Sequence, residues 1–367
     1  MSMKNIKFTG LLTRKKAVRY LIYVLFVCAF AVFVIKLNQV EKTELVVRTG
    51  QTFEKAKVVK ILQDNLEENG TRVGEQKVRV RMLTGVRKGE ELDITSSSGY
   101  LFGAACKPGM KVIVMQSVAG DSTVASVYTQ DREGVIYIFA LIYLLVLCLI
   151  GGKQGIKGCL GLVFTFFCVI FVYLPLVYLK YSPFWTAVFV CFITTLVTMY
   201  LIGGPTRKTC AATLGTLVGV ILAGVSAWCF SKASGISGYN VSDIETLMTL
   251  WNTNRIQVGG LLFSGLLISC LGAVMDVAMS ISSAIDEIYR QNLSLSRKEL
   301  FKAGLRVGRD MMGTDSNTLI LAFAGSSVST LLLDYSYNLP YQQIINSNNI
   351  GIAIMQGLAG RFGASAP

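Results

Sequence analysis

Two apolar segments of the chain, residues 272–287 and 308–319, carry the side chains best placed for chemistry. They hold acidic, hydroxyl and amide groups: Asp276, Ser280, Ser283, Asp310, Thr314, Asp315 and Asn317. An ionisable group at membrane depth costs about 2.5 to 3.5 kcal/mol on insertion scales, so such groups are usually kept for a pathway, a partner or a gate. These residues are therefore a candidate polar or ion pathway, in which an aspartate couples a proton or a cation to movement.

Catalytic chemistry is restricted by the absence of histidine, the commonest general base and metal ligand. Ser-His, Cys-His and two-histidine zinc sites are excluded. Asp276 and Asp310 could still share a proton as a carboxylate pair, but the GxGD element of intramembrane aspartyl proteases is absent. We therefore expect no enzyme activity, no metal and no cofactor.

The nine cysteines give no sign of a disulfide framework or a metal site. None belongs to a CxxC pair, and Cys106 is the one outside an apolar run. Such thiols usually behave as small buried apolar groups.

The composition is that of an integral membrane protein. Of 367 residues, 52% are hydrophobic and 16% are charged, with a mean hydropathy of +0.54. Seven uncharged runs approach the length that crosses a bilayer, at residues 20–35, 134–152, 158–179, 182–202, 210–230, 256–285 (broken by Asp276) and 316–333. An eighth run begins at Ile350 and stops at Arg361, which is too short to cross.

The distribution of basic residues predicts a cytoplasmic N-terminus. With that orientation the inner segments carry sixteen Lys and Arg residues, and the short outer loops carry three. The tryptophans Trp185, Trp228 and Trp251 then fall at the outer interface. No small-residue cleavage pattern follows the first run, so we expect it to remain as a signal anchor rather than a cleaved signal peptide.

Residues 38–133 have a different pattern, with frequent charge, alternation such as Lys77-Val78-Arg79-Val80, and turn signals between the runs. This pattern predicts a small extracytoplasmic β domain of about five strands, a barrel or a sandwich, with the OB fold as one form. Nucleic acid is not an expected partner, because the aromatic residues are not interleaved with the basic strand. The expected organisation is residues 1–37 as basic tail and anchor, 38–133 as β domain, and 134–367 as a mainly α polytopic bundle with six full spans and an incomplete last one.

Helical spacing places the polar residues of the sixth span on one face. These are Gly265, Ser269, Gly272, Asp276, Ser280, Ser283 and Glu287. Asp310, Gly313, Thr314 and Asn317 likewise share a face, and the two faces are candidates to meet near the cytoplasmic side. The run 256–285 would be about 45 Å long as one helix, with Gly272 as a candidate break.

Three further patterns bear on packing. In the fifth span small residues recur every fourth position, at Ala211, Gly215, Gly219, Ala223 and Ala227. This spacing favours close helix packing, with a sliding interface as the alternative. A capping box at Ser296 and Glu299 predicts a separate basic helix on the inner membrane surface. Ser242 and Glu245 predict a similar interfacial helix on the outer side.

The sequences GAVMDVAMSISSAIDE at 272–287 and GRDMMGTDSNTLILAFAGSS at 308–327 resemble those of the YibE/F-like family of bacterial multi-span membrane proteins. The order of parts, an anchor, an outer β domain and a helical bundle, is also similar. The resemblance implies a bacterial cell membrane location and a suspected role in transport. It also implies a further full span at the end, whereas here the last run turns at Arg361 into a short polar segment, as in a shortened version.

The function expected from these patterns is that of a transporter or permease component for an unknown small solute or ion, with a polar site between the sixth and seventh spans. The alternative is a non-transporting scaffold or assembly factor whose outer β domain binds a partner. The lipid bilayer and a membrane protein are the expected partners.

Overall fold

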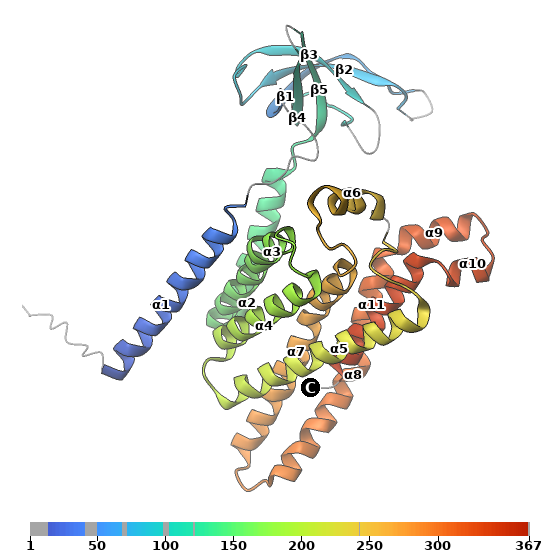
Figure 1. Cartoon of the computed structure of the whole chain (residues 1–367). Helices are drawn as coiled ribbons and strands as arrows, with labels where there is room; N and C mark the ends of the chain where they lie inside the picture. The colour runs from blue at the N-terminus through green and yellow to red at the C-terminus, as the bar shows by residue number, and fades with distance from the viewer. Residues whose placement is uncertain are drawn as a thin grey trace, which may run out of the picture. The chain divides into compact units, whose positions relative to one another are not determined.

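The computed structural model describes residues 14–40, 50–67, 72–97, 103–119, 122–241 and 243–365 (Figure 1). The chain divides into two compact units. One comprises Glu44–Leu149, and the other comprises Met1–Thr43 together with Ile150–Pro367. The chain is mostly helical, with a small five-stranded barrel near the N-terminus, as the sequence predicts.

The barrel consists of five strands in the closed order β1-β2-β3-β5-β4. Their bounds are β1 Gln51–Gln63, β2 Glu75–Met82, β3 Glu91–Ser97, β4 Lys111–Ala119 and β5 Ser122–Gln130. All pairings are antiparallel except that of β3 with β5, which is parallel. A closed five-stranded barrel of this kind is the OB-like form that the sequence analysis named.

The alternation of β2 decides which side chains fill the barrel. Gln76, Val78, Val80 and Met82 are buried and the intervening residues face outward. The amide of Gln76 is satisfied inside, because it donates to the Cys106 carbonyl at 3.2 Å and accepts from the Cys106 N–H at 2.9 Å. The outward residues Arg79 and Arg81 pair with acidic residues of β3, and Arg79 donates to Asp93 at 2.6 Å.

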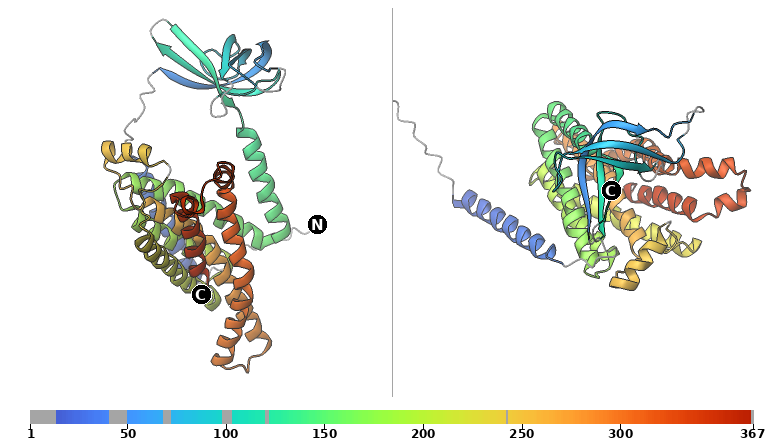
Figure 2. Two further views of the ribbon diagram at one scale, coloured as in Figure 1. Left: turned by 90° about the vertical axis from the view of Figure 1, so that its right-hand side faces the viewer. Right: turned by 90° about the horizontal axis from the view of Figure 1, so that it is seen from above.

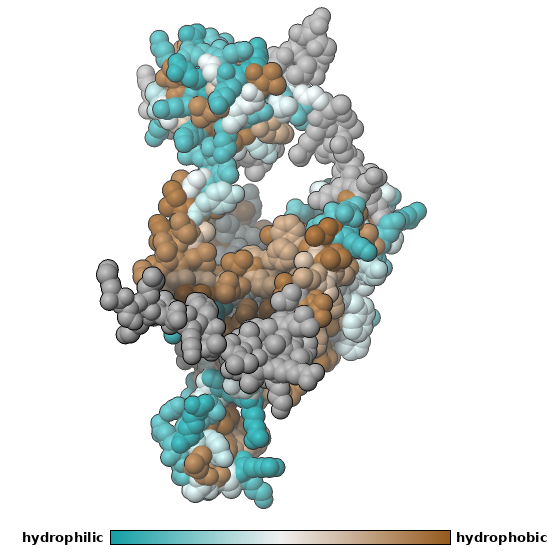
Figure 3. Space-filling model, turned by 90° about the vertical axis from the view of Figure 1, so that its left-hand side faces the viewer, coloured by the Kyte–Doolittle hydropathy of each residue, from teal (hydrophilic) through white to brown (hydrophobic). Residues whose placement is uncertain are grey.

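The other unit is built from helices. Their bounds are α1 Arg14–Leu37, α2 Glu133–Cys168, η1 Val169–Tyr173, α3 Leu174–Tyr178, α4 Pro183–Gly203, α5 Arg207–Ser234, α6 Ile244–Asn254, α7 Leu261–Gln291, α8 Arg297–Ser326, α9 Val328–Ser336, α10 Tyr341–Ile345 and α11 Asn348–Ala364. Helix α2 begins in the barrel unit and continues into this one. Broad apolar surface covers these helices, and hydrophilic residues gather at the tip of the α7–α8 hairpin (Figure 3).

Four helical segments among the described residues are long and apolar enough to cross a membrane. They are Glu133–Tyr178, Pro183–Gly203, Arg207–Ser234 and Leu261–Gln291. The first contains two predicted spans, which are separated by non-helical backbone at Gly152 (φ 52°, ψ −131°). The predicted first span lies in α1, of which Val27–Leu37 is a shorter apolar helix.

The predicted span 316–333 is wrong as a single helix. Helix α8 ends at Ser326, and α9 begins at Val328. Gly325, Ser326 and Ser327 are weak helix formers, and the Ser327 N–H binds the carbonyls of Ala324 and Gly325 in a tightened last turn. Figures 1 and 2 show α9 leaving the direction of α8 at this point.

Two other expectations about these helices are also wrong. The basic helix that begins at the Ser296 cap is not a separate surface element, because it continues without a break as the first half of α8. Gly272 does not interrupt α7, which is helical from Leu261 to Gln291. A single glycine inside a helix costs about 1 kcal/mol relative to alanine, and the packing of a long helix readily offsets that. On the predicted outer side, Ile244–Asn254 is helical as expected, but Ser242 lies outside the described residues.

Candidate functional site

Helix α7 presents two sides of different character. One side is apolar and buried, and includes Val274, Val277 and Ala278. The other, which we call the α7 polar face, consists of Gly265, Ser269, Gly272, Asp276, Ser280, Ser283 and Glu287. On this face Asp276 and Ser280 are exposed, and a Cβ built at Gly265 or Gly272 would meet nothing within 4 Å. Asp276 is two residues from Val274, about 200° around the helix, so the polar face is the outward one.

Helix α8 starts at a complete capping box. The Ser296 side chain accepts from the Glu299 N–H, and the Glu299 carboxylate accepts from the Ser296 N–H at 2.8 Å. The hydrogen bonds from Ser296 hold the pKa of Glu299 below its ordinary value. This cap fixes where the helix begins and therefore which residues of α8 lie beside α7.

The two helices pack as an antiparallel hairpin through glycines of α8. A Cβ at Gly304 would lie 2.8 Å from Ile285 Cδ1, and one at Gly308 would lie 3.4 Å from Ile281 Cδ1. Ile281 and Ile285 follow Val274 by seven and eleven residues, so they lie on its side of α7. The contact between the helices thus leaves the α7 polar face outside it.

The polar residues of α8 are also directed away from this contact. Asp310 is two residues from Gly308, about 200° around the helix, and both Asp310 and Asn317 are exposed. The backbone of Thr314 and Asp315 belongs to α8, but their side chains lie outside the described residues. Of the other predicted site residues, Ser283 is half-buried. The hairpin contact therefore does not bring the two polar faces against each other.

A residue that the sequence analysis missed lies next to this segment. Arg361 of α11 is only 9% exposed, and its guanidinium donates a hydrogen bond to the Met312 carbonyl of α8. One turn earlier, a Cβ at Gly357 would lie 3.7 Å from Ile320 Cγ1, so α11 runs antiparallel to α8. Arg361 is thereby placed beside the stretch of α8 that carries the polar residues. The sequence feature that could have indicated the burial of Arg361 is the run of glycines and alanines around it, because small residues permit close helix packing.

Helix α5 contacts both α7 and α11, and these contacts relate the heights of residues on the two helices. A Cβ at Gly219 would lie 2.5 Å from Val274 Cγ1 of α7 and 2.6 Å from the Gly363 oxygen of α11. Val274 is two residues from Asp276, and Gly363 is two residues from Arg361, so these charged residues lie at similar heights in the unit. We call this region the α7–α8–α11 junction.

The predicted small-residue face of α5 is only partly buried. Gly219, Ala223 and Ala227 are buried where α11 packs, Gly215 is half-buried, and Ala211 is exposed. A Cβ at Gly363 would lie 2.8 Å from the Ala223 Cβ, which shows how closely α5 and α11 approach. This contact is the close helix packing that the spacing predicted.

The junction combines a buried cation with carboxylates on outward helix faces. Among the described residues, no group of three His, Cys, Asp or Glu side chains is placed to hold a metal ion. The side chains of the junction can pair charges and can donate and accept hydrogen bonds.

Comparison with known proteins assigns the bundle to a family. The family model described as YibE/F-like protein matches residues 139–366, more than half of the chain. No curated protein and no solved structure matches the chain.

Proposed function

This chain belongs to the YibE/F-like family, and from that premise we propose that it is a component of a membrane permease for a small solute or ion. The proposal places it in the bacterial cell membrane, with the N-terminus inside and residues 38–133 outside. The α7 polar face forms one wall of the route. The chain spans the membrane several times, in keeping with its four membrane-length helical segments.

The observation that carries the proposal is the outward direction of the α7 polar face. Asp276 and Ser280 are exposed on a helix that is long and apolar enough to span a bilayer. Hydrocarbon cannot hydrogen-bond such groups, so in a membrane they face water or protein. A route between this wall and a second wall, supplied by another membrane protein, keeps these exposed groups out of hydrocarbon.

Arg361 has a supporting role in this proposal. A buried guanidinium is stabilised by hydrogen bonds, and one acceptor is the Met312 carbonyl. This hydrogen bond ties α11 to the stretch of α8 that carries Asp310.

Membrane vesicles from cells that express the chain test the proposal, because they also contain its membrane partner. The vesicles are loaded with the pH indicator pyranine and exposed to outward gradients of Na⁺ or K⁺, and internal pH is followed. We expect a cation-driven pH change that Asp276→Asn abolishes. Asp286→Asn, the same change on the same helix in a surface pair with Arg290, should leave the flux intact. Equal flux in wild type and Asp276→Asn would refute the coupling role.

The scaffold alternative is favoured by one feature of the barrel. Phe53 and Tyr128 are both 41% exposed and stack edge to face at 5.1 Å, which gives the barrel an aromatic surface of the type found at protein interfaces. Under this alternative, Phe53→Ser with Tyr128→Ser abolishes the cellular function, and Asp276→Asn has no effect. Under the permease proposal Asp276→Asn abolishes the cellular function, and the double barrel variant has no effect.

A further inference from the structure

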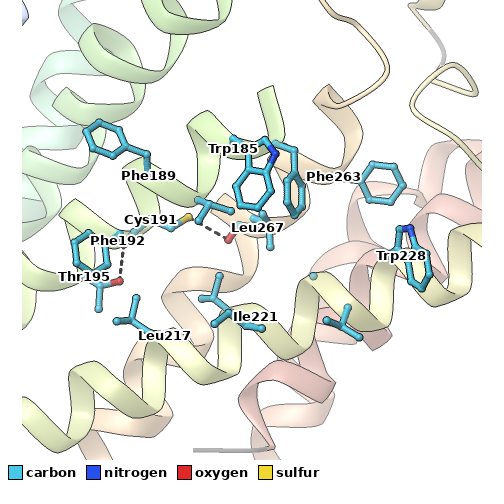
Figure 4. A pocket seen from close by; sticks show the side chains of 15 residues that line it. Trp185, Phe189, Cys191, Phe192, Thr195, Leu217, Ile221, Trp228, Phe263 and Leu267 are labelled. Atoms are coloured by element: carbon cyan, nitrogen blue, oxygen red, sulfur yellow. Dashed lines mark hydrogen bonds between the residues drawn. The ribbon is translucent and has the colours of Figure 1, made fainter. Parts of the chain in front are cut away.

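A large apolar groove lies between α4 and α5, over α7. The two helices diverge from the short turn that joins them at Gly204, and α7 forms the floor (Figure 4). The groove has a volume of about 1010 Å³, at the upper end of the range of ligand sites. Phe189 and Phe192 line the α4 wall, Ile221 lines the α5 wall, and Leu267 lies on the floor.

The Cys191 thiol and the Thr195 hydroxyl, which lie in the groove, already have partners. The Cys191 thiol is directed to the Leu267 carbonyl at 3.8 Å, and the Thr195 hydroxyl donates to the Cys191 carbonyl at 2.7 Å. A polar solute would leave its own groups unsatisfied here, at a cost of several kcal/mol in an apolar medium. The groove therefore fits an apolar ligand.

The shape of the walls distinguishes a flexible chain from a docked helix. Helices in membranes approach each other over small residues, as α5 and α11 do at Gly219 and Gly363. The groove walls instead carry bulky side chains such as Phe189, Phe192 and Trp228. A hydrocarbon chain can follow such a surface, and a helix cannot approach it closely.

One end of the groove has the features of a membrane interface. Trp185 lies in the first turn of α4 and Trp228 near the end of α5, so both mark the same end of these antiparallel helices. Lys232 follows Trp228 by four residues and so continues the same face of α5, and Lys180 lies in the turn before α4. Both lysines are exposed, and they place positive charge at this end.

We propose that the groove binds an acyl chain of an anionic phospholipid, whose phosphate lies at Lys232, with Lys180 adding positive charge at the same end. The apolar walls select hydrocarbon, and the two lysines select an anionic headgroup over a zwitterionic one. Nearby Lys or Arg residues contribute about 1 kcal/mol each toward anionic lipid. The groove is separate from the α7–α8–α11 junction, and its ligand does not depend on the permease proposal.

Native mass spectrometry of the delipidated full chain tests this site, with phosphatidylglycerol and phosphatidylcholine titrated separately. We expect phosphatidylglycerol to bind more tightly, and Lys232→Gln to weaken its binding roughly fivefold without changing that of phosphatidylcholine. Lys208→Gln, at the other end of α5, is the matched control and should bind as wild type. Equal affinities for the two lipids in wild type would overturn the proposal.

A second pair of variants tests the location. Ile221→Trp fills the groove and should remove lipid binding, whereas Leu214→Trp changes a side chain of similar exposure on the same helix outside it. Ile221 is 63% exposed, so the larger ring does not press on the core, and Val225→Trp provides an independent filling variant. Retained binding in both filling variants would refute the site. A doubled mass that Ile221→Trp returns to the single-chain value would show instead that a second copy occupies it.

Discussion

Strand β2 and helix α7 both present one polar side and one apolar side, but the two sides have different surroundings. In β2 the outward residues include Arg79, which pairs with Asp93 in the barrel unit. In α7 the outward residues include Asp276 and Ser280, on a helix apolar enough to cross a membrane. An outward polar side chain is satisfied by water, whereas lipid offers it no hydrogen bonds. In the barrel this pattern therefore indicates a surface that faces water. At α7 it indicates a further protein contact or a water-filled space.

The cores of the two units differ in a related way. The barrel is closed by large apolar side chains such as Met82, which is 1% exposed. In the helical unit the closest helix contacts occur at glycines, where Gly219 packs against Gly363 and Val274. Apolar burial in water stabilises the first, and close backbone packing stabilises the second.

Truncating the barrel core should give the largest effect. Met82→Ala removes a fully buried side chain, and we expect the barrel to lose about 2–5 kcal/mol of unfolding free energy. Cys106 is buried in the same core, so its labelling by a membrane-impermeant maleimide reports barrel opening. The labelling rate should rise roughly 30-fold or more. Val86→Ala, at a fully exposed position, should label as wild type, and a similar rise in that variant would contradict the comparison.

Adding one methyl group between helices should give an intermediate effect. In Gly219→Ala the new Cβ meets Val274 and the Gly363 carbonyl, so the helices must move apart, at a cost of about 1–3 kcal/mol. In Gly265→Ala the Cβ meets nothing within 4 Å, and the helix gains up to about 1 kcal/mol. Thermal unfolding and hydrogen exchange of α11 should therefore shift in opposite directions in the two variants. Shifts of the same sign would show that α5 and α11 are not held by this contact.

The smallest effect is expected at the α8 cap, and it depends on pH. Hydrogen bonds from Ser296 lower the pKa of Glu299 from its ordinary value of 4.5. Because the folded pKa is the lower one, the stabilisation is fully present above pH 4.5 and is lost as the pH falls through the folded value. Hydrogen-exchange protection of the first turn of α8 should fall in acid in the wild type, and it should change less in Glu299→Gln. An equal acid response in both would exclude the capping box as its cause.

Much of the architecture could be predicted because it depends on local pattern. Period-two alternation specified β2, and the apolar runs 182–202 and 210–230 specified α4 and α5. The Ser296 cap could also be predicted, because a capping box depends only on two residues three positions apart. The break at Ser327 was missed, because hydropathy does not distinguish a continuous helix from two consecutive ones.

The candidate site was less predictable than the helices that carry it. Arg361 was interpreted as the end of an apolar run, because a charged residue in a linear sequence usually marks a boundary. Its burial results from the packing of α11 against α5, α7 and α8. The direction of the polar faces could not be predicted either. Helical spacing shows which residues share a face, but it does not show which neighbouring helix that face contacts.

By itself, the sequence determined that the protein is a membrane protein with a small β domain, and it determined which residues of α7 and α8 are polar. These properties follow from composition and from the periods of strand and helix, which are local. Only the tertiary structure decided that Gly304 and Gly308 form the contact with α7, that the polar faces turn outward, and that Arg361 is buried beside Met312. In a helix such as α5, whose hydrophobicity is nearly even all round, hydrophobicity does not select the contact face. Close approach at small residues selects that face, and it is a property of pairs of helices.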